Sequence, residues 1–232
     1  MLIRLNDVDL TSTMRTPGHD FELAAGFCLA EGVLAGVEVA NIRYCGSGPA
    51  MDTDFNVVSV ETNGPTPDIA RRLSAVTSSC GLCGHEAISS LTDRLAPMVD
   101  YAPWPTAVLL DAAARVVAQQ RLFAATGSAH VAAALDRTGR VVVAREDIGR
   151  HNAVDKVVGR LLLDQALPAS DLLLFVSSRA SFEIVQKAWA GGFTALVAVS
   201  GPSALAVATA RAAGMTLVGF ARDHGANQYS PI

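Results

Sequence analysis

The chain has 232 residues and a formal net charge of -4. Half of its residues are hydrophobic, and only 17% are charged. This composition predicts one large or two small folded domains and excludes long disordered stretches. The negative charge argues against indiscriminate binding to duplex nucleic acid, and no apolar run reaches the roughly 18 residues that cross a bilayer. Because the first residues also lack the features of a signal peptide, we expect a cytoplasmic protein without a membrane segment.

The first hundred residues predict a small α+β unit. Asp20 follows a Pro-Gly turn and is placed to cap the helix after it. Apolar residues then recur at helical spacing, and two short strands follow. The predicted elements are an edge strand at 2–10, a turn at 14–20, a helix at 21–33, strands at 39–44 and 55–61, and a candidate helix at 68–73.

A pair of cysteines, Cys80 and Cys83, lies in the segment TSSCGLCGH, where glycines and serines leave both sulfurs accessible. A short helix is expected to begin at His85, and its free N–H groups would favour the thiolate form. Such a pair suits dithiol redox exchange, zinc binding or the passage of a sulfur atom as a persulfide. The spacing alone does not choose among these three chemistries.

The other two cysteines have a simpler interpretation. Cys28 lies in an apolar helical pattern and Cys45 at the end of a predicted strand, so both are expected to fill the core. Four cysteines are too few for a secreted disulfide framework. Without a second Cys-x-x-Cys, a four-cysteine zinc site is disfavoured.

Pro97, Pro103 and Pro105 mark the predicted domain boundary, which divides the chain into residues 1–103 and 104–232. Beyond it, continuously apolar strands alternate with helices, which is typical of a parallel sheet covered on both faces. The second domain is therefore predicted to be a layered α/β domain. Its predicted elements are helices at 111–125, 150–166, 181–190 and 203–213, and strands at 140–144, 172–176, 195–199 and 216–220.

Polar segments follow four of these strands, at 145–152, 177–181, 200–203 and 221–227. In an α/β sheet, ligands bind beyond the carboxyl ends of the strands. Small and hydroxyl residues before helices bind anions, and Arg150, Arg179 and Arg222 would add charge for phosphate. The alternative is ordinary helix capping, which remains as good an explanation for His151 and Asn152. Neither a Walker loop nor a GxGxxG motif is present, so ATP hydrolysis and hydride transfer gain no support.

Five stretches carry a family resemblance: MRTPGHDFELAAGFCLAEG, SSCGLCG, EDIGRHNAVDKVVG, SSRASFEIVQKAWAGG and LAVATARAAGMTLVGFARDHGANQY. Together they closely resemble the FdhD family of formate dehydrogenase accessory proteins, from about residue 13 to residue 229. The resemblance implies a sulfurtransferase, a carrier that accepts persulfide sulfur from a cysteine desulfurase. The sulfur is delivered to the molybdenum or tungsten bis(molybdopterin guanine dinucleotide) cofactor of formate dehydrogenase.

The resemblance also implies a cytidine-deaminase-like three-layer α/β/α domain, with the Cys-x-x-Cys loop in the smaller N-terminal domain. A guanine-nucleotide pocket is expected to hold one end of the client cofactor and to accept GDP or GMP, and a homodimer is usual. The zinc-ligand set of the deaminases is missing, so no bound metal and no base deamination are expected. The alternative within this family is a chaperone that binds the cofactor without transferring sulfur.

By position, Cys80 takes the role of persulfide bearer and Cys83 that of its partner, which either tunes or resolves it. The family's cofactor-binding stretch falls on Phe220, Ala221, Arg222, Asp223, His224 and Gly225, and the polar sheet edge adds Ser178, Arg179, Gly149, Arg150, His151 and Asn152. Two departures from the family concern the ligand. Ser128 stands where a glycine is common before His130, and a further basic residue near Gly225 is missing.

Overall fold

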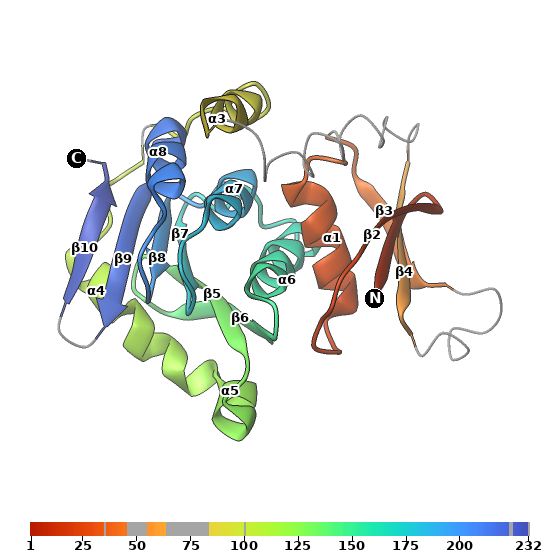
Figure 1. Ribbon diagram of the computed structural model, residues 1–232, viewed down its shortest axis with the longest axis horizontal. Helices are drawn as coiled ribbons and strands as arrows, with labels where there is room; N and C mark the ends of the chain where they lie inside the picture. The colour runs from red at the N-terminus through yellow and green to blue at the C-terminus, as the bar shows by residue number, and fades with distance from the viewer. Residues whose placement is uncertain (35, 46–54, 64–83, 100, 223–224, 232) are drawn as a thin grey trace.

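A computed structural model places the chain in two β-sheets with helices around them, and describes residues 1–34, 36–45, 55–63, 84–99, 101–222 and 225–231. In Figure 1 the smaller sheet and α1 lie at one end of the molecule and the larger sheet at the other. The elements are β1 (Leu2–Leu5), β2 (Val8–Ser12), α1 (Asp20–Ala30), β3 (Val39–Tyr44), β4 (Val57–Thr62), α3 (Gly84–Thr92), α4 (Thr106–Val116), η3 (Val117–Gln119), α5 (Arg121–Thr126), β5 (His130–Asp136), β6 (Val141–Asp147), α6 (Arg150–Leu163), β7 (Leu172–Val176), α7 (Phe182–Ala190), β8 (Ala195–Ala198), α8 (Ala204–Ala213), β9 (Thr216–Arg222) and β10 (Gly225–Ser230).

The smaller sheet has the strand order β2-β1-β4-β3. The single edge strand predicted at 2–10 is wrong, because Asn6 and Asp7 both have positive φ angles and turn the chain into a β1–β2 hairpin. β1 is interior and pairs in parallel with β4. One face of this sheet packs on α1 in a core that includes Ile3, Val58 and Cys28.

The predicted cap of the first helix is also wrong. His19, in the left-handed conformation, precedes α1, and Asp20 is the first helical residue. The Asp20 carboxylate is buried and accepts hydrogen bonds from the Arg15 guanidinium at 2.9 Å and the Tyr44 hydroxyl at 3.2 Å. The carboxylate is therefore engaged by tertiary partners, and no side chain caps the helix.

The larger sheet has the strand order β10-β9-β8-β7-β5-β6. Only β7, β8 and β9 pair in parallel, so the predicted parallel sheet is in fact mixed. β5 is antiparallel to both of its neighbours, and β10 returns antiparallel to β9. Because β5 reverses direction between them, β6 runs the same way as β7. The carboxyl ends of β6, β7, β8 and β9 therefore lie at one edge of the sheet, as predicted.

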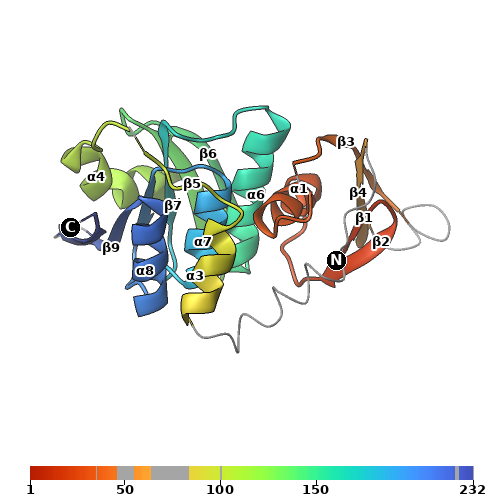
Figure 2. The same cartoon turned by 90° about the horizontal axis from the view of Figure 1, so that it is seen from above.

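Helices cover both faces of this sheet, with α4 on one side and α3, α6, α7 and α8 on the other (Figure 2). Alternate side chains of each strand serve opposite cores. Leu174 and Leu196 pack toward α6, α7 and α8, whereas Leu173 and Val197 pack against Trp104 and other residues on the α4 side. The predicted α/β fold class is confirmed by this architecture, while its cytidine-deaminase-like detail stays a prediction.

The two sheets are joined through α1 and α6, which cross almost backbone to backbone. A Cβ atom built on Gly26 would lie 1.9 Å from the Asp155 carbonyl oxygen, and one on Gly159 would lie 1.8 Å from that of Glu22. Glycine at both positions permits this approach. The Glu22 carboxylate also accepts two hydrogen bonds from Arg145 at 2.6 and 2.8 Å.

The segment between the two predicted domains is hydrogen-bonded to the part of the protein that contains the larger sheet. The Met98 N–H donates to the Ala213 carbonyl at 2.8 Å, and the Trp104 indole donates to the Thr194 hydroxyl at 3.0 Å. The boundary at 103/104 stays a prediction, and the candidate helix at 68–73 lies outside the described residues. Within the described part of the chain, every helix is too short or too polar to cross a membrane.

Candidate functional site

The polar segments that follow the parallel strands lie side by side at the carboxyl edge of the larger sheet. The Ser200 N–H donates to the Ser178 carbonyl at 3.4 Å, and the Phe220 N–H donates to the Ser200 carbonyl at 3.3 Å. A further bond of 3.1 Å runs from the Ser203 N–H to the Ala180 carbonyl. Segments separated in sequence by a whole helix therefore form one continuous backbone surface.

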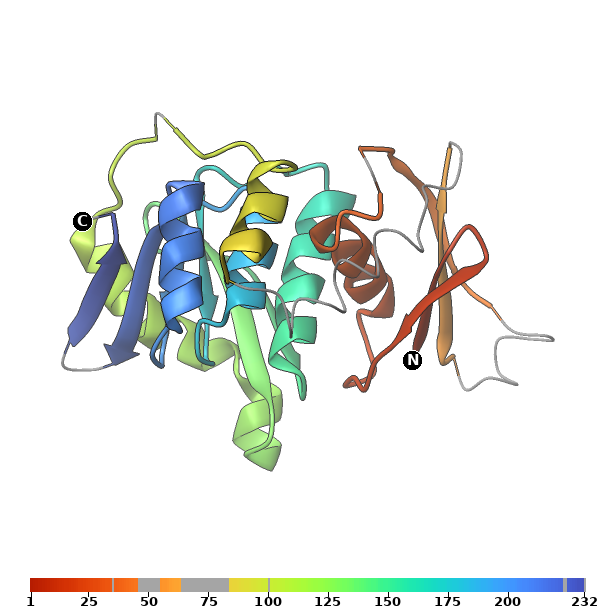
Figure 3. The ribbon, with the colours of Figure 1, turned by 45° about the horizontal axis from the view of Figure 1, so that its top comes forward.

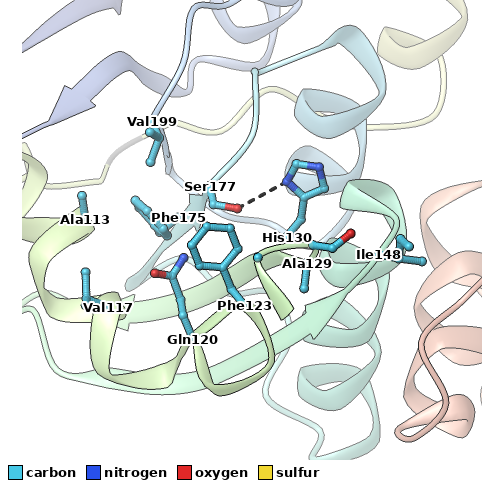
Figure 4. Close-up of a pocket in the computed structure, with 12 residues that line it drawn as sticks. Ala113, Val117, Gln120, Phe123, Ala129, His130, Ile148, Phe175, Ser177 and Val199 are labelled. Carbon is cyan, nitrogen blue, oxygen red and sulfur yellow. Dashed lines mark hydrogen bonds between the residues drawn. The ribbon is translucent and has the colours of Figure 1, made fainter. Parts of the chain in front are cut away.

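A cavity of about 460 Å³ opens at this edge, between the strand ends and α5 (Figure 4). Its volume is within the range of about 300–1,000 Å³ that is typical of small-ligand sites. The cavity is lined by Ala113, Val117, Gln120, Phe123, Gly127, Ser128, Ala129, His130, Ile148, Phe175, Ser177 and Val199. Apolar walls with a few polar groups are the usual composition of a ligand pocket.

His130 and Ser177 form the polar centre of the pocket. The Ser177 hydroxyl accepts a hydrogen bond from the Val131 N–H at 3.0 Å and lies 3.5 Å from Nδ1 of His130. Burial lowers the pKa of His130, and the nearby positive charge of Arg150 lowers it further. The neutral ring and the hydroxyl can therefore donate or accept hydrogen bonds with a ligand in the pocket.

Arg150 and His151 begin α6 beside this pocket. Gly149 is the N-cap of α6, and no side chain caps the helix, so helix capping does not explain His151. The Nε2 atom of His151 lies 3.5 Å from the Ser181 hydroxyl, and burial first, then Arg150, lower its pKa to about 4. The Nε atom of Arg150 is buried and has no hydrogen-bond partner among the described residues. A guanidinium group at a helix N-terminus is suited to an anion.

The other predicted ligand residues surround the same edge. Arg179 is exposed, and Ser178 is buried with its hydroxyl donating to the Arg179 carbonyl at 3.0 Å. Arg222 is exposed and donates from Nε to the Val199 carbonyl at 3.3 Å. Beside these, Phe220 is 45% exposed, Ala221 is fully buried and Gly225 is exposed. Asp223 and His224 lie outside the described residues. The ligand roles of all these residues stay predictions.

Asn152 and Gly149 serve the junction with the N-terminal segment. The Asn152 amide donates to the Met14 carbonyl at 2.7 Å and to the buried Asp147 carboxylate at 3.1 Å. Asp147 also accepts hydrogen bonds from the N–H groups of Gly149 and Thr16, and it forms an ion pair of 2.7 Å with Lys156. This network holds the turn before α6 against the segment that precedes α1.

The structure describes two of the four cysteines, the pair that is predicted to fill the core. Cys28 and Cys45 are both buried, and burial raises the pKa of the Cys28 thiol, so their role as core residues is confirmed. Cys80 and Cys83 lie outside the described residues. Among the residues that the structure describes, no group of His, Cys, Asp or Glu side chains is arranged to hold a metal ion.

The sequence missed the wall of the pocket. The sequence predicts Gln120 and Phe123 to lie in one long helix at 111–125, and Ser177 only in a polar segment, whereas all three line the cavity. Ser128, where the chain departs from the family pattern, and His130 do line the cavity, together with Gly127 and Ala129 beside and between them. The sequence signal for this wall is the aromatic residue Phe123, which stands shortly before Gly127.

Comparison with solved structures places this architecture in a known class. The chain superposes on a protein of Desulfotalea psychrophila described as a formate dehydrogenase accessory protein, with a TM-score of 0.74 and 27% identity over 98% of this chain and 85% of the other. The fold therefore places the chain in the mixed α/β class of this solved structure, with the candidate pocket at the edge of the larger sheet.

Sequence comparison identifies the family. The "Sulfur carrier protein FdhD" of Streptomyces coelicolor is 48% identical over 98% of this chain and 84% of its own length, and that of Streptomyces avermitilis is 46% identical over the same shares. The FdhD/NarQ family model matches residues 1–231. The chain therefore belongs to the FdhD/NarQ family, and the predicted resemblance is confirmed.

Proposed function

We propose that this protein is a sulfurtransferase that carries sulfur as a persulfide on Cys80. The sulfur comes from a cysteine desulfurase and goes to the molybdenum or tungsten bis(molybdopterin guanine dinucleotide) cofactor of a formate dehydrogenase. The observation that carries this proposal is the similarity over 98% of the chain to relatives named as sulfur carriers. The matched range includes Cys80 and Cys83.

The first step of the proposed reaction is thiol exchange. The Cys80 thiolate attacks the outer sulfur of the desulfurase persulfide, the original S–S bond breaks, and the desulfurase cysteine leaves as a thiolate. A new S–S bond forms on Cys80, so no net oxidation occurs. A persulfide is largely ionised at neutral pH and can pass its outer sulfur to a metal centre.

Cys83 has one of two roles in release of the sulfur. As a resolving residue, its thiolate attacks the inner sulfur of the Cys80 persulfide, and the outer sulfur leaves as hydrosulfide. The two electrons come from the two cysteines, which end as a disulfide. As a tuning residue, Cys83 only favours the Cys80 thiolate and stays a thiol.

The pocket at the sheet edge is proposed to hold the guanine-nucleotide end of the client cofactor. Three features support this assignment: the volume of about 460 Å³, the neutral His130 beside Ser177, and the buried Nε of Arg150, which no described residue hydrogen-bonds. Arg179 and Arg222 lie exposed at the same edge and would contact phosphate. GDP and GMP are expected to bind in the same place.

Intact-mass spectrometry after incubation with a cysteine desulfurase and free cysteine tests the proposal. The parent protein should gain the mass of one sulfur atom, and Cys80→Ala should gain none. Cys83→Ala should keep the persulfide in either role, and only the resolving role predicts that it fails to release hydrosulfide. Persulfide on Cys80→Ala would contradict the assignment of the carrier residue.

The alternative function is a chaperone that binds the cofactor and delivers it to formate dehydrogenase without sulfur transfer. The pocket alone favours this alternative as much as the first proposal, since both need a bound nucleotide. A formate dehydrogenase produced together with Cys80→Ala distinguishes the two functions. The carrier function predicts an inactive dehydrogenase, whereas the chaperone function predicts full activity.

A cytoplasmic homodimer is part of the proposal, and its mass in solution can be measured by light scattering.

A further inference from the structure

One wall of the pocket is formed by α5, and the start of this helix is hydrogen-bonded to the side chain of Glu146. None of the residues of α5 is buried, and the helix projects from the edge of the larger sheet (Figure 3). The Glu146 carboxylate of β6 accepts hydrogen bonds from the N–H of Leu122 at 2.7 Å and of Phe123 at 2.9 Å. Each oxygen of one side chain thus binds one of the free amides at the start of the helix.

This carboxylate also fixes the position of Phe123, because it binds the backbone N–H of that residue. The ring of Phe123 lines the cavity near Gln120 and Ser177 in Figure 4 and is 46% exposed. An exposed aromatic ring in a pocket offers a flat apolar surface, which is suited to stacking against a planar group. Burying that face on a ligand would remove apolar surface from water.

Gln120 supplies polar recognition at the same wall. Its side chain lines the cavity and is half-buried, and its amide has no hydrogen bond to any of the described residues. An amide carries both a donor and an acceptor. The Gln120 amide can therefore donate one hydrogen bond and accept another at the edge of a base that presents a carbonyl oxygen beside an N–H, as guanine does.

The geometry points to α5 and the residue before it as the base-recognising wall of the pocket. Phe123 stacks on the purine ring, Gln120 binds its edge, and Glu146 is a positioning residue that places Phe123. This inference rests on the proposed nucleotide pocket and assigns the part of the ligand that α5 contacts. The charged groups near Arg150 would then face the phosphate end.

Calorimetric titration with GDP tests the stacking role. Phe123→Leu keeps apolar bulk but removes the flat face, and it should weaken GDP binding at least about fivefold, given the usual contribution of base stacking. Phe123→Tyr keeps the ring and should stay within about twofold of the parent. Phe55→Leu is the matched control, since Phe55 is 44% exposed and lies on the smaller sheet side of the molecule. It should leave the affinity unchanged.

A double-mutant cycle tests the positioning role of Glu146. Glu146→Gln should weaken GDP binding in the parent, but it should have almost no further effect in the Phe123→Leu background if it acts through Phe123. An equal loss in both backgrounds would overturn the positioning role. For Gln120→Leu, the ratio of GDP to ADP affinity should fall about tenfold, as expected when a two-bond base contact is lost.

Unchanged GDP affinity in Phe123→Leu would overturn the inference while leaving the nucleotide pocket intact. No GDP binding by the parent would overturn both the inference and the pocket. Sulfur loading of Cys80, measured on the parent protein and on the Phe55→Leu control, separates these failures from failure of the carrier function.

Discussion

The junction between the sheets and the pocket at the sheet edge use charge in opposite ways. At the junction, Lys187 lies between the carboxylates of Glu31 and Asp155 at 3.1 and 2.8 Å, and all three side chains are buried. At the sheet edge beside the pocket, Arg179 is exposed, and the buried Nε atom of Arg150 has no hydrogen-bond partner in the described part of the chain. Paired charges hold the structure together, whereas unpaired ones are available to a ligand.

Breaking the junction pair should give the largest effect on stability. Lys187→Met would leave two buried carboxylates without their cation, which should cost about 3–5 kcal/mol of unfolding free energy. Urea unfolding measures this loss. Arg4→Met, which removes an exposed pair with Asp9, should cost less than about 1 kcal/mol. Similar losses in both variants would contradict the contrast between buried and exposed pairs.

A glycine substitution at the junction should come next. Gly26→Ala would place a methyl group 1.9 Å from the Asp155 carbonyl oxygen, and the two helix backbones must separate, at a cost of about 3 kcal/mol. Gly201→Ala at the sheet edge would meet only the tip of the half-exposed Phe220 ring, at 2.7 Å. Because that ring can turn away, its cost should be below about 1 kcal/mol. Thermal melting of the two variants compares the two regions directly.

The pH dependence of stability should carry two contributions of opposite sign. Burial raises the pKa of Asp155 from 3.8 to about 6, although Lys187 opposes the shift. The folded protein therefore binds this proton more tightly than the unfolded chain does. The protonated Asp155 carboxyl makes its full contribution to the free energy of unfolding below pH 3.8, its ordinary pKa. This contribution is lost as the pH rises toward 6. Asp155→Asn should remove this loss, which is on the order of 2 kcal/mol.

His151 should act in the other direction. Its pKa is lowered from 6.5 to about 4, chiefly by burial, so the unfolded chain binds the proton more tightly. Stability from His151 is complete above its ordinary pKa and is lost as the pH falls toward 4. His151→Gln should therefore make the slope of stability against pH less positive between about pH 4 and pH 6.5. Urea midpoints measured from pH 4 to pH 7 would contradict both assignments if the two variants changed the slope in the same direction.

The smallest expected effect on stability belongs to the ligand edge. Arg179→Ala should leave the melting temperature unchanged, because the side chain is exposed and makes no hydrogen bond or ion pair with the described residues. It should nevertheless weaken GDP binding by about tenfold, since a charge-assisted hydrogen bond to phosphate is lost. Arg140→Ala, at an exposed site on the Asp136 turn, is the matched control for charge and should not change GDP affinity.

Local patterns in the sequence predicted much of the larger sheet. The strand at 172–176 has the predicted bounds, and Ser203 caps α8 through a hydrogen bond to the Ala206 N–H. The common edge was predicted because polar segments follow apolar strands. The β9–β10 hairpin was missed, since Gly225 to Ser230 is largely exposed and polar and lacks the apolar pattern of a strand.

The pocket wall was missed for a different reason. A single helix at 111–125 was predicted, but the helix ends at Val116, and α5 begins at Arg121 after a short 3-10 turn. No proline or glycine marks this break. The Glu146 carboxylate, more than twenty residues away, binds the amides at the start of α5. A long-range contact of this kind cannot be read from local sequence.

The transfer of sulfur from Cys80 to the client cofactor is tested most directly with radiolabelled sulfur. The parent protein is loaded by a cysteine desulfurase with labelled cysteine, freed of small molecules, and mixed with a formate dehydrogenase that contains its unsulfurated cofactor. Label should appear on the dehydrogenase cofactor, and Cys80→Ala should deliver none. Label that stays on the carrier while the dehydrogenase becomes active would contradict sulfur transfer.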